Sequence, residues 1–158
     1  MKNITPFLWF DDQAEEAINF YISVFPNSRL LNLTRLGDDA PGPKGKVMTA
    51  TFELNGRQFM ALNGGPQDFH FSEAISFFVD CETQAEVDDL WEKLTDGGEP
   101  GPCGWLKDKY GLSWQIVPKA LGEMLGDPDP ARAGRVMQAM LKMSKIDIAG
   151  LRQAYEAA

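Results

Sequence analysis

The sequence predicts an α+β fold of two βαβββ modules followed by C-terminal helices. Two observations lead to this prediction. A short apolar strand passes into a capped helix near the start of the chain, and the same transition recurs about 70 residues later. An Asn-Gly dipeptide also separates two strand-like runs. An internal repeat is weighed before any short motif because it decides the whole fold.

Both helices of the repeat begin with residues typical of an N-terminal cap. Asp12 and Thr83 each follow an apolar run, and Glu15 and Glu86 stand three residues further on. A side-chain oxygen at the first of these positions accepts from the first-turn N–H groups, and the glutamate reaches back. The sequence therefore predicts a capping box at the start of each helix.

The rest of the first module, residues 1–66, reads as three strands. Asn55-Gly56 indicates a tight hairpin, because both residues tolerate the positive φ angles of a type I′ turn. Glycine, proline and aspartate make residues 37–45 a loop. The expected strands are residues 29–36, 47–54 and 57–63.

The second module, residues 72–118, repeats this order in a shorter form. Gly97-Gly98 ends its helix, and a turn at residues 108–111 joins its last two strands. The expected elements are a strand at 74–80, a helix at 83–96, and strands at 104–107 and 112–117.

Residues 119–158 form a helical appendix that belongs to neither repeat. Asp129 can cap a helix there, and a second, shorter helix is expected over residues 145–155. Apolar side chains recur at helical spacing on the first of these helices. This methionine-rich face is either a partner surface or packs on its own subunit, and the two alternatives are about equally favoured. The face consists of Val136, Met137, Met140 and Leu141.

Composition excludes several classes of protein. The chain has 158 residues and a formal net charge of −8, which argues against nucleic-acid binding. No basic-plus-apolar signal and no long apolar run appears, so we expect a cytoplasmic protein without a membrane segment. Cys81 and Cys103 are too few for a disulfide scaffold and match no zinc motif.

Few residues are candidates for covalent or acid–base chemistry. His70 is the only histidine and lies in the loop between the modules, where a solvated bystander is the favoured interpretation. Its alternative role is a gating or acid–base group at a cavity mouth. Cys81 and Cys103 are more simply explained as buried structural thiols than as nucleophiles. Catalytic residues therefore stay unknown.

Aromatic and amide side chains at strand ends give a stronger signal. Side chains alternate along a strand, so Thr5, Phe7 and Trp9 share one face, and Ser113, Gln115 and Val117 share another. Apolar walls with a few polar groups are typical of a small-molecule cavity, although tryptophans are often core residues. The predicted ligand-binding set is Thr5, Phe7, Trp9, Asn63, His70, Trp105, Trp114 and Gln115.

Several stretches together resemble a known family. The repeated order of strand, cap and helix is similar to the vicinal oxygen chelate superfamily, which includes glyoxalase, bleomycin-resistance proteins and dihydroxybiphenyl dioxygenase. The details resemble its PhnB-like subgroup, and the resemblance covers nearly the whole chain. The stretches that carry it are residues 7–10, 14–21, 61–66, 73–76 and 103–115.

The resemblance implies one glyoxalase-like domain with a cup-shaped mixed sheet around a cavity, usually in a homodimer. It also implies four metal-ligand slots, which fall at Thr5, Ala61, Ala74 or Ser76, and Gln115. Alanine has no donor atom, and a hydroxyl is a poor ligand beside imidazole or carboxylate. Only Gln115 could serve, so we predict neither a metal nor another cofactor.

Three functions stay open at this point. The first is binding of an unidentified small molecule, with or without catalysis, in the absence of the usual metal centre. The second is a metal-dependent lyase, isomerase or dioxygenase of the same superfamily, which the poor ligand set disfavours. The third is a demethylubiquinone methyltransferase, a label that the subgroup sometimes carries. Gly64-Gly65 leads to another strand and lacks the context of a nucleotide-binding fingerprint.

Overall fold

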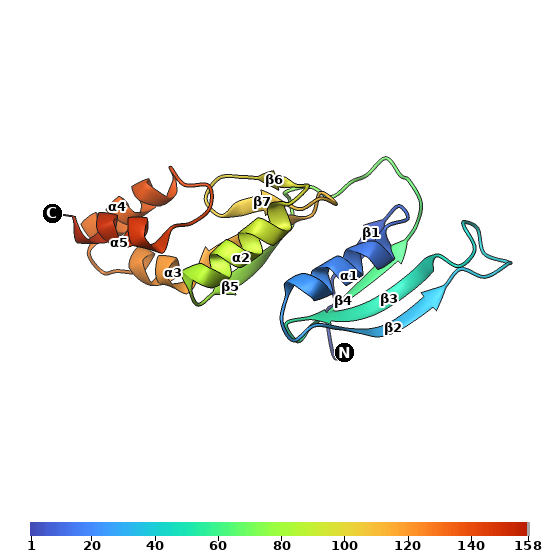
Figure 1. Ribbon diagram of the computed structural model, residues 1–158. Helices are drawn as coiled ribbons and strands as arrows, with labels where there is room; N and C mark the ends of the chain where they lie inside the picture. The colour runs from blue at the N-terminus through green and yellow to red at the C-terminus, as the bar shows by residue number, and fades with distance from the viewer. Residues whose placement is uncertain (158) are drawn as a thin grey trace. The chain divides into compact units, whose positions relative to one another are not determined.

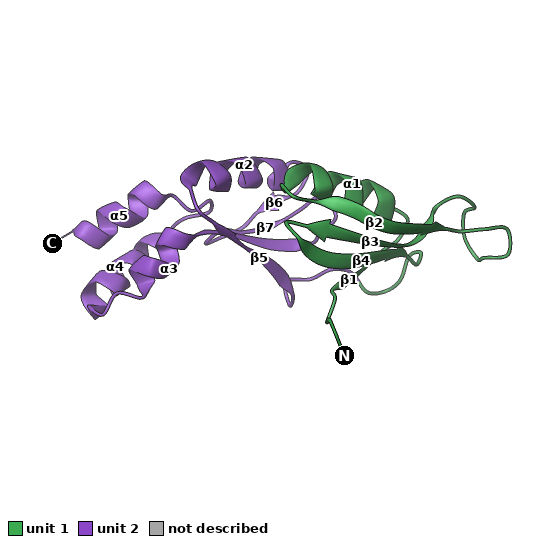
Figure 2. Ribbon diagram, turned by 90° about the horizontal axis from the view of Figure 1, so that it is seen from below, with its two compact units in different colours: residues 1–69 green, residues 70–158 purple. Residues whose placement is uncertain are grey.

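A computed structural model describes residues 1–157, and the chain divides into two units. The first comprises residues 1–69 and the second begins at His70 (Figure 2). Each unit contains one βαβββ module, and three further helices follow the second (Figure 1). The predicted α+β class with two such modules and C-terminal helices is therefore confirmed. The division at residues 66, 72 and 118 stays a prediction of the sequence.

In the first unit, the chain forms a mixed four-stranded sheet in the order β1-β4-β3-β2. β1 runs parallel to β4, and the other pairs are antiparallel. Asn55 and Gly56 connect β3 to β4 with φ angles of 49° and 79°, which confirms the predicted hairpin. The elements are β1 (Phe7–Phe10), α1 (Ala14–Val24), β2 (Arg29–Arg35), β3 (Val47–Leu54) and β4 (Arg57–Asn63).

Helix α1 covers one face of this sheet, as Figure 1 shows. Its apolar stripe, which includes Ile18 and Tyr21, is buried against alternate sheet residues such as Phe52 and Phe59. These two phenylalanine rings stack with their centroids 5.6 Å apart. The other face of the sheet has no helix of its own unit over it.

The cap of α1 differs from the predicted one. The capping position is Gln13, which makes no side-chain bond, so the prediction for Asp12 and Glu15 is wrong. Glu15 instead forms a bidentate pair with Arg35, whose hydrogen bonds lower the pKa of this carboxyl. The N–H of Ala14 donates to Oδ1 of Asn63 at 2.8 Å. The last residue of β4 thus caps a helix that begins 49 residues earlier.

The second unit repeats the sheet in the order β5-β8-β7-β6, with β5 parallel to β8. α2 packs on one face through Val87, Leu90 and Leu94. The two-residue strand β6 was not among the predicted elements. The elements are β5 (Ser76–Cys81), α2 (Gln84–Thr95), β6 (Glu99–Pro100), β7 (Trp105–Lys107) and β8 (Ser113–Pro118).

Helix α2 supplies its own cap. The Oγ1 of Thr83 accepts from the N–H of Glu86 at 3.2 Å, as predicted. The Glu86 carboxylate accepts from the N–H of Glu82, one residue before the expected partner. The two modules therefore begin their helices by different means.

Asp108 organises the turn between β7 and β8. Its buried carboxylate accepts from the backbone N–H groups of Tyr110 and Leu112 and from Nε1 of Trp114 at 2.8 Å. A buried carboxylate with several donors is stable because each lone pair that loses water gains a partner. This turn consequently depends on one side chain.

Three C-terminal helices complete the second unit: α3 (Lys119–Leu125), α4 (Pro130–Met140) and α5 (Ile148–Glu156). They enclose their own apolar cluster, which includes Leu121, Val136 and Leu151. Asp129 caps α4 by accepting from the N–H of Ala131, as predicted. The Gln84 side chain accepts from the N–H of Ile148, so α2 helps to fix the start of α5. α3 begins directly after β8 and was not predicted.

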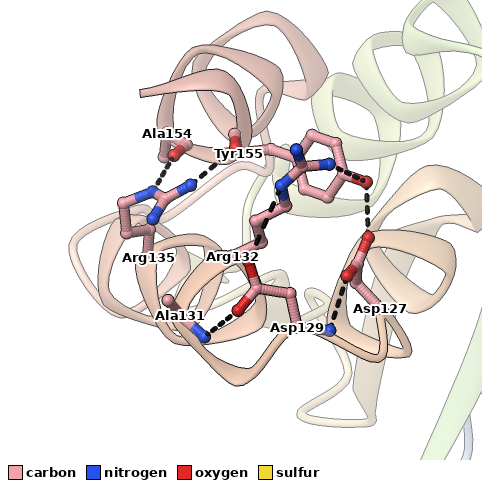
Figure 3. A network of polar contacts seen from close by, with 7 residues as sticks. All are labelled: Asp127, Asp129, Ala131, Arg132, Arg135, Ala154 and Tyr155. Carbon is pink, nitrogen blue, oxygen red and sulfur yellow. Dashed lines mark hydrogen bonds and ion pairs between the residues drawn. The ribbon is translucent and has the colours of Figure 1, made fainter. Parts of the chain in front are cut away.

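Figure 3 shows how α4 is tied to the end of α5. The Tyr155 hydroxyl donates to Asp127, and this bond is the main cause of a lowered pKa at that carboxyl. Arg135 donates to the backbone oxygens of Ala154 and Tyr155 at 3.0 Å. A cation near a helix C-terminus also complements the helix dipole. The network therefore stabilises the packing of α4 against the end of α5.

No helix among residues 1–157 is both long enough and apolar enough to cross a membrane.

Candidate functional site

On the open face of the first sheet, the part formed by β1 and β4 is largely apolar. Phe7 and Trp9 on β1 are 47% and 36% exposed, whereas the residues that alternate with them are buried. Their partners on β4 are Met60 and Leu62, both half-buried. Thr51 on β3 lies opposite Met60. Exposed aromatic rings on a sheet are typical of surfaces that contact a ligand or another protein.

The loop after β4 holds the indole ring of Trp9. Nε1 of Trp9 donates to the carbonyl of Gly65 at 3.1 Å, and Phe69 packs edge-on at 5.2 Å between ring centroids. A Cβ at Gly64 would stand 2.1 Å from the indole, so only glycine permits this close approach. The glycines that follow β4 therefore serve packing around Trp9.

Asn63 has a structural role at the end of β4. Its Oδ1 accepts from Ala14, as described above, and its Nδ2 donates to the carbonyl of Val47 at 3.0 Å. Both ends of the amide are thus engaged within the module. A ligand would have to compete with these bonds to reach it.

On the open face of the second sheet, an amide stands at the position that matches Met60 of the first. Gln115 on β8 donates from Nε2 to Oγ of Ser76 at 2.9 Å. The register places Phe78 on one side of Gln115 and Trp105 on the other, so all four share a face. Phe78 is exposed, while Trp105 and Gln115 are half-buried. Two of the predicted residues, Trp105 and Gln115, are therefore neighbours.

A groove of about 470 Å³ lies at the β6–β7 edge of this face. Nζ of Lys107 pairs with the Glu73 carboxylate at 2.6 Å. This bond raises the pKa of Lys107 and lowers that of Glu73. Residues from β6, β7, β8 and the segment before β5 line the groove, among them Glu73, Glu99, Pro100, Trp105, Lys107 and Ser113.

Trp114 does not belong to this face. It is 3% exposed, packs against Phe77 at 5.4 Å between ring centroids, and donates to the buried Asp108. Alternation along β8 places it on the side that α2 covers. We therefore correct the prediction that Trp114 lines a cavity, because its indole belongs to the core.

The remaining predicted binding residues, Thr5 and His70, lie outside both sheets. Thr5 precedes β1 and is half-buried, and His70 is exposed in the segment that links β4 to β5. Cys81 is buried, which raises the pKa of its thiol to about 12 and keeps it protonated at neutral pH. Cys103 lies in a turn with a φ of 56° and not in a strand.

The donor atoms on these faces do not suit a catalytic metal. Ala61, one of the slots implied by the resemblance, is fully buried against α1, and the open-face residue beside it is Met60. At the implied slots of the second module, the donors are the neutral side chains of Gln115 and Ser76. Amide, hydroxyl and thioether groups are weak ligands compared with imidazole or carboxylate. Among residues 1–157 no three His, Cys, Asp or Glu side chains cluster as a metal site would require.

Solved structures resemble the chain over most of their length. A PhnB protein from Bacillus cereus is 40% identical and has a TM-score of 0.69. The match covers 74% of this chain and 99% of that one. Protein PA1353 from Pseudomonas aeruginosa is 23% identical, with a TM-score of 0.63 and coverage of 75% and 98%. The fosfomycin resistance protein FosX from Mesorhizobium loti is 13% identical, with a TM-score of 0.57 and coverage of 80% and 99%. The last two share the fold.

Among curated proteins, no sequence matches this chain. The protein family described as 3-demethylubiquinone-9 3-methyltransferase matches residues 2–117, which span both modules. Together with the identity to the Bacillus cereus protein, this match agrees with the resemblance that the sequence motifs carried. The chain therefore belongs to this family, the PhnB-like branch of the vicinal oxygen chelate superfamily.

Proposed function

We propose that this protein binds a small organic molecule on the open faces of its sheets and does so without the metal centre of its superfamily. The observation that carries the proposal is the aromatic and amide chemistry of those faces. Phe7 and Trp9 are exposed in the first module, and Gln115 lies between Phe78 and Trp105 in the second. Mostly apolar surfaces with a few fixed polar groups are what small-molecule sites require.

The donor chemistry supports a site without a metal. Gln115 and Ser76 are neutral and hydrogen-bonded to each other, and the first module has the thioether of Met60 at the position that matches Gln115. A metal-dependent lyase, isomerase or dioxygenase would need better ligands. Elemental analysis after dialysis should therefore find no stoichiometric zinc, nickel, iron or manganese, and added metal should restore no activity. A stoichiometric metal, or activity that added metal restores, would favour that enzyme class.

The family description raises methyl transfer as another possibility. Gly64-Gly65, the glycine pair that follows a strand, is engaged in packing Trp9 and leads into a loop without a helix N-terminus. This arrangement lacks the phosphate-binding geometry of a nucleotide site. We expect no binding of S-adenosylmethionine in a calorimetric titration, and tight binding would overturn this part of the proposal.

A thermal-shift screen of a metabolite library tests the proposed function. A ligand that binds only the native state raises the melting temperature by mass action. Each hit is then titrated into the wild-type protein, Trp9→Phe and Gln115→Ala, with Trp91→Phe on α2 as the matched fluorescence control. Gln115→Ala should weaken binding by about 1–2 kcal/mol, because it leaves a polar ligand group unpaired.

Loss of the fluorescence change in Trp9→Phe, but not in Trp91→Phe, would place the ligand on the open face of the first sheet. Unchanged affinity in Gln115→Ala, together with an undiminished signal in Trp9→Phe, would place the site elsewhere. The loop that carries His70 would then be the next region to test.

A homodimer is part of the proposal. Met137 on α4 and Leu141, which caps the C-terminus of this helix, are 39% and 55% exposed, while Val136 packs inward. Exposed apolar side chains on one helix face are common at subunit interfaces. Light scattering across a concentration series should report about twice the chain mass. A monomer at all concentrations would contradict this part, and a cytoplasmic location also stays a prediction.

A further inference from the structure

Ser113 on β8 combines two properties that rarely occur together. The residue is 1% exposed, and its Oγ has no hydrogen-bond partner among residues 1–157. It also lines the groove at the β6–β7 edge of the open face. A buried hydroxyl without a partner costs free energy, and such a group in a native protein calls for an explanation. A ligand hydroxyl in the groove would supply one.

An ion pair lines the same groove as this hydroxyl. Ser113 is flanked in the sheet by Ser76 on β5 and Lys107 on β7. The Lys107 ammonium pairs with Glu73, which lies three residues before Ser76 in the chain. The bridge therefore links β7 to the segment that precedes β5, and both of its side chains line the same groove as Ser113. The Glu73 side chain is 60% exposed and the Lys107 side chain 36%, so the bridge opens at little cost.

The rest of the groove indicates what would bind. Trp105 and Pro100 give it an apolar wall suited to an aromatic ring. Its charges are two carboxylates, Glu73 and Glu99, against the single ammonium of Lys107. An acidic surplus on a chain of net charge −8 disfavours anionic ligands.

We propose that the Glu73–Lys107 bridge is a removable cover, and that the groove beneath it binds a neutral or cationic aromatic alcohol whose hydroxyl pairs with Ser113 Oγ. This inference rests on the proposed small-molecule function and names the ligand class at one end of the same face. Gln115 lies two residues along β8 from Ser113, so one extended ligand can contact both.

Three phenols that differ in charge test the ligand class: p-cresol, tyramine and 4-hydroxyphenylacetate. Binding is followed through the backbone amide signals of β7 and β8 in ¹⁵N-labelled full-length protein. Tyramine and p-cresol should shift these signals at lower concentrations than the acetate. Equal or tighter binding of 4-hydroxyphenylacetate, or no shift in β7 and β8 with any probe, overturns the inference.

Ser113→Ala tests the hydroxyl itself. The affinity for p-cresol should fall by about fivefold to tenfold, the loss expected for one hydrogen bond. The urea midpoint should stay the same or rise, because the native protein loses no internal bond. A lowered midpoint, or unchanged p-cresol affinity, overturns the inference, since a structural hydroxyl would affect stability and not binding.

Glu73→Gln tests the cover. Breaking the bridge should tighten p-cresol binding by about twofold to fivefold, the range expected for an exposed ion pair. Glu53→Gln is the control, because Glu53 forms an ion pair with Arg29 at 3.1 Å in the first module, away from the groove, and its loss should leave p-cresol binding unchanged. Weaker p-cresol binding in Glu73→Gln would contradict the proposal that the bridge covers the groove.

The two proposals fail in different ways. Library hits that depend on Gln115 or Trp9, with no phenol bound at β7 and β8, would refute the groove and leave the proposed function in place. Hits whose binding is unaffected by both Gln115→Ala and Trp9→Phe would refute the proposed function itself.

Discussion

The two modules have the same strand order in their separate sheets but differ in the chemistry of their open faces. Strand register matches them position by position: an exposed phenylalanine, Phe7 or Phe78, pairs with Met60 in the first module and with Gln115 in the second. A thioether in one sheet thus corresponds to an amide in the other. On the side facing the helix, the matched positions remain apolar.

The charged positions also differ. Arg29 pairs with Glu53 in the first module, and the corresponding pair in the register of the second is Glu99 and Lys107, with the signs reversed. Lys107 turns instead to Glu73, outside the sheet. Packing under the helices fixes the fold and limits change there, whereas the open faces are free to diverge. The comparison indicates that an amide is available beside Phe78 in the second module, where the first module has a thioether beside Phe7.

The two hairpin turns should differ most in their sensitivity to mutation. Asp108→Ala removes an acceptor from two backbone N–H groups and a buried indole, and should cost about 3 kcal/mol. Gly56→Ala in the first module adds only a Cβ at a φ of 79° and should cost about 1 kcal/mol. Urea unfolding measures both losses of unfolding free energy, and equal losses would contradict the predicted difference between the turns.

The helix caps give a smaller difference. Asn63→Ala removes two hydrogen bonds that link β4 to α1 and β3, so we expect a loss of about 2 kcal/mol. Thr83→Ala removes one local cap and should cost about 1 kcal/mol. Chemical denaturation of the two variants tests the order. A larger loss in Thr83→Ala would show that the distant cap contributes little.

Acid should loosen the second unit more than the first. Glu73, Asp88 and Asp127 in the second unit have lowered pKa values because of hydrogen bonds to Lys107, Gln84 and Tyr155, and Glu15 is the corresponding group in the first.

A folded pKa below the unfolded value gives stability that is complete above the unfolded pKa, about 4 to 4.5, and is lost as the pH falls through the folded pKa. Amide exchange measured at mildly acidic pH and again below pH ~4 should therefore show the greater loss of protection in α3–α5. Uniform loss across both units would contradict this expectation.

Local signals made most of the fold predictable. The Asn55-Gly56 turn, the Thr83 cap and the apolar alternation of the strands each act within a few residues, so the sequence displays them. The α1 cap was mispredicted because its acceptor, Asn63, comes from a distant strand. Trp114 was misplaced because its aromatic character alone does not reveal which face of β8 it occupies.

The candidate site was only partly predictable for a related reason. Alternation places Ser113 and Gln115 on one face, and the structure brings Trp105 beside Gln115. The shared groove of Ser113 and the Glu73–Lys107 pair arises only when β7, β8 and the segment before β5 assemble. Neither the spacing of these residues nor their types signals it.

The four tryptophans allow the central claim to be tested in one experiment. Trp9 and Trp105 lie on open sheet faces, whereas Trp114 is in the core and Trp91 is on α2. The measurement is the shift of the four indole Nε1–H signals of ¹⁵N-labelled protein during titration with a hit from the thermal-shift screen. We predict that Trp9 or Trp105 shifts while Trp91 and Trp114 remain in place. A dominant shift at Trp91, or no shift at either open-face indole, would contradict ligand binding on the open faces.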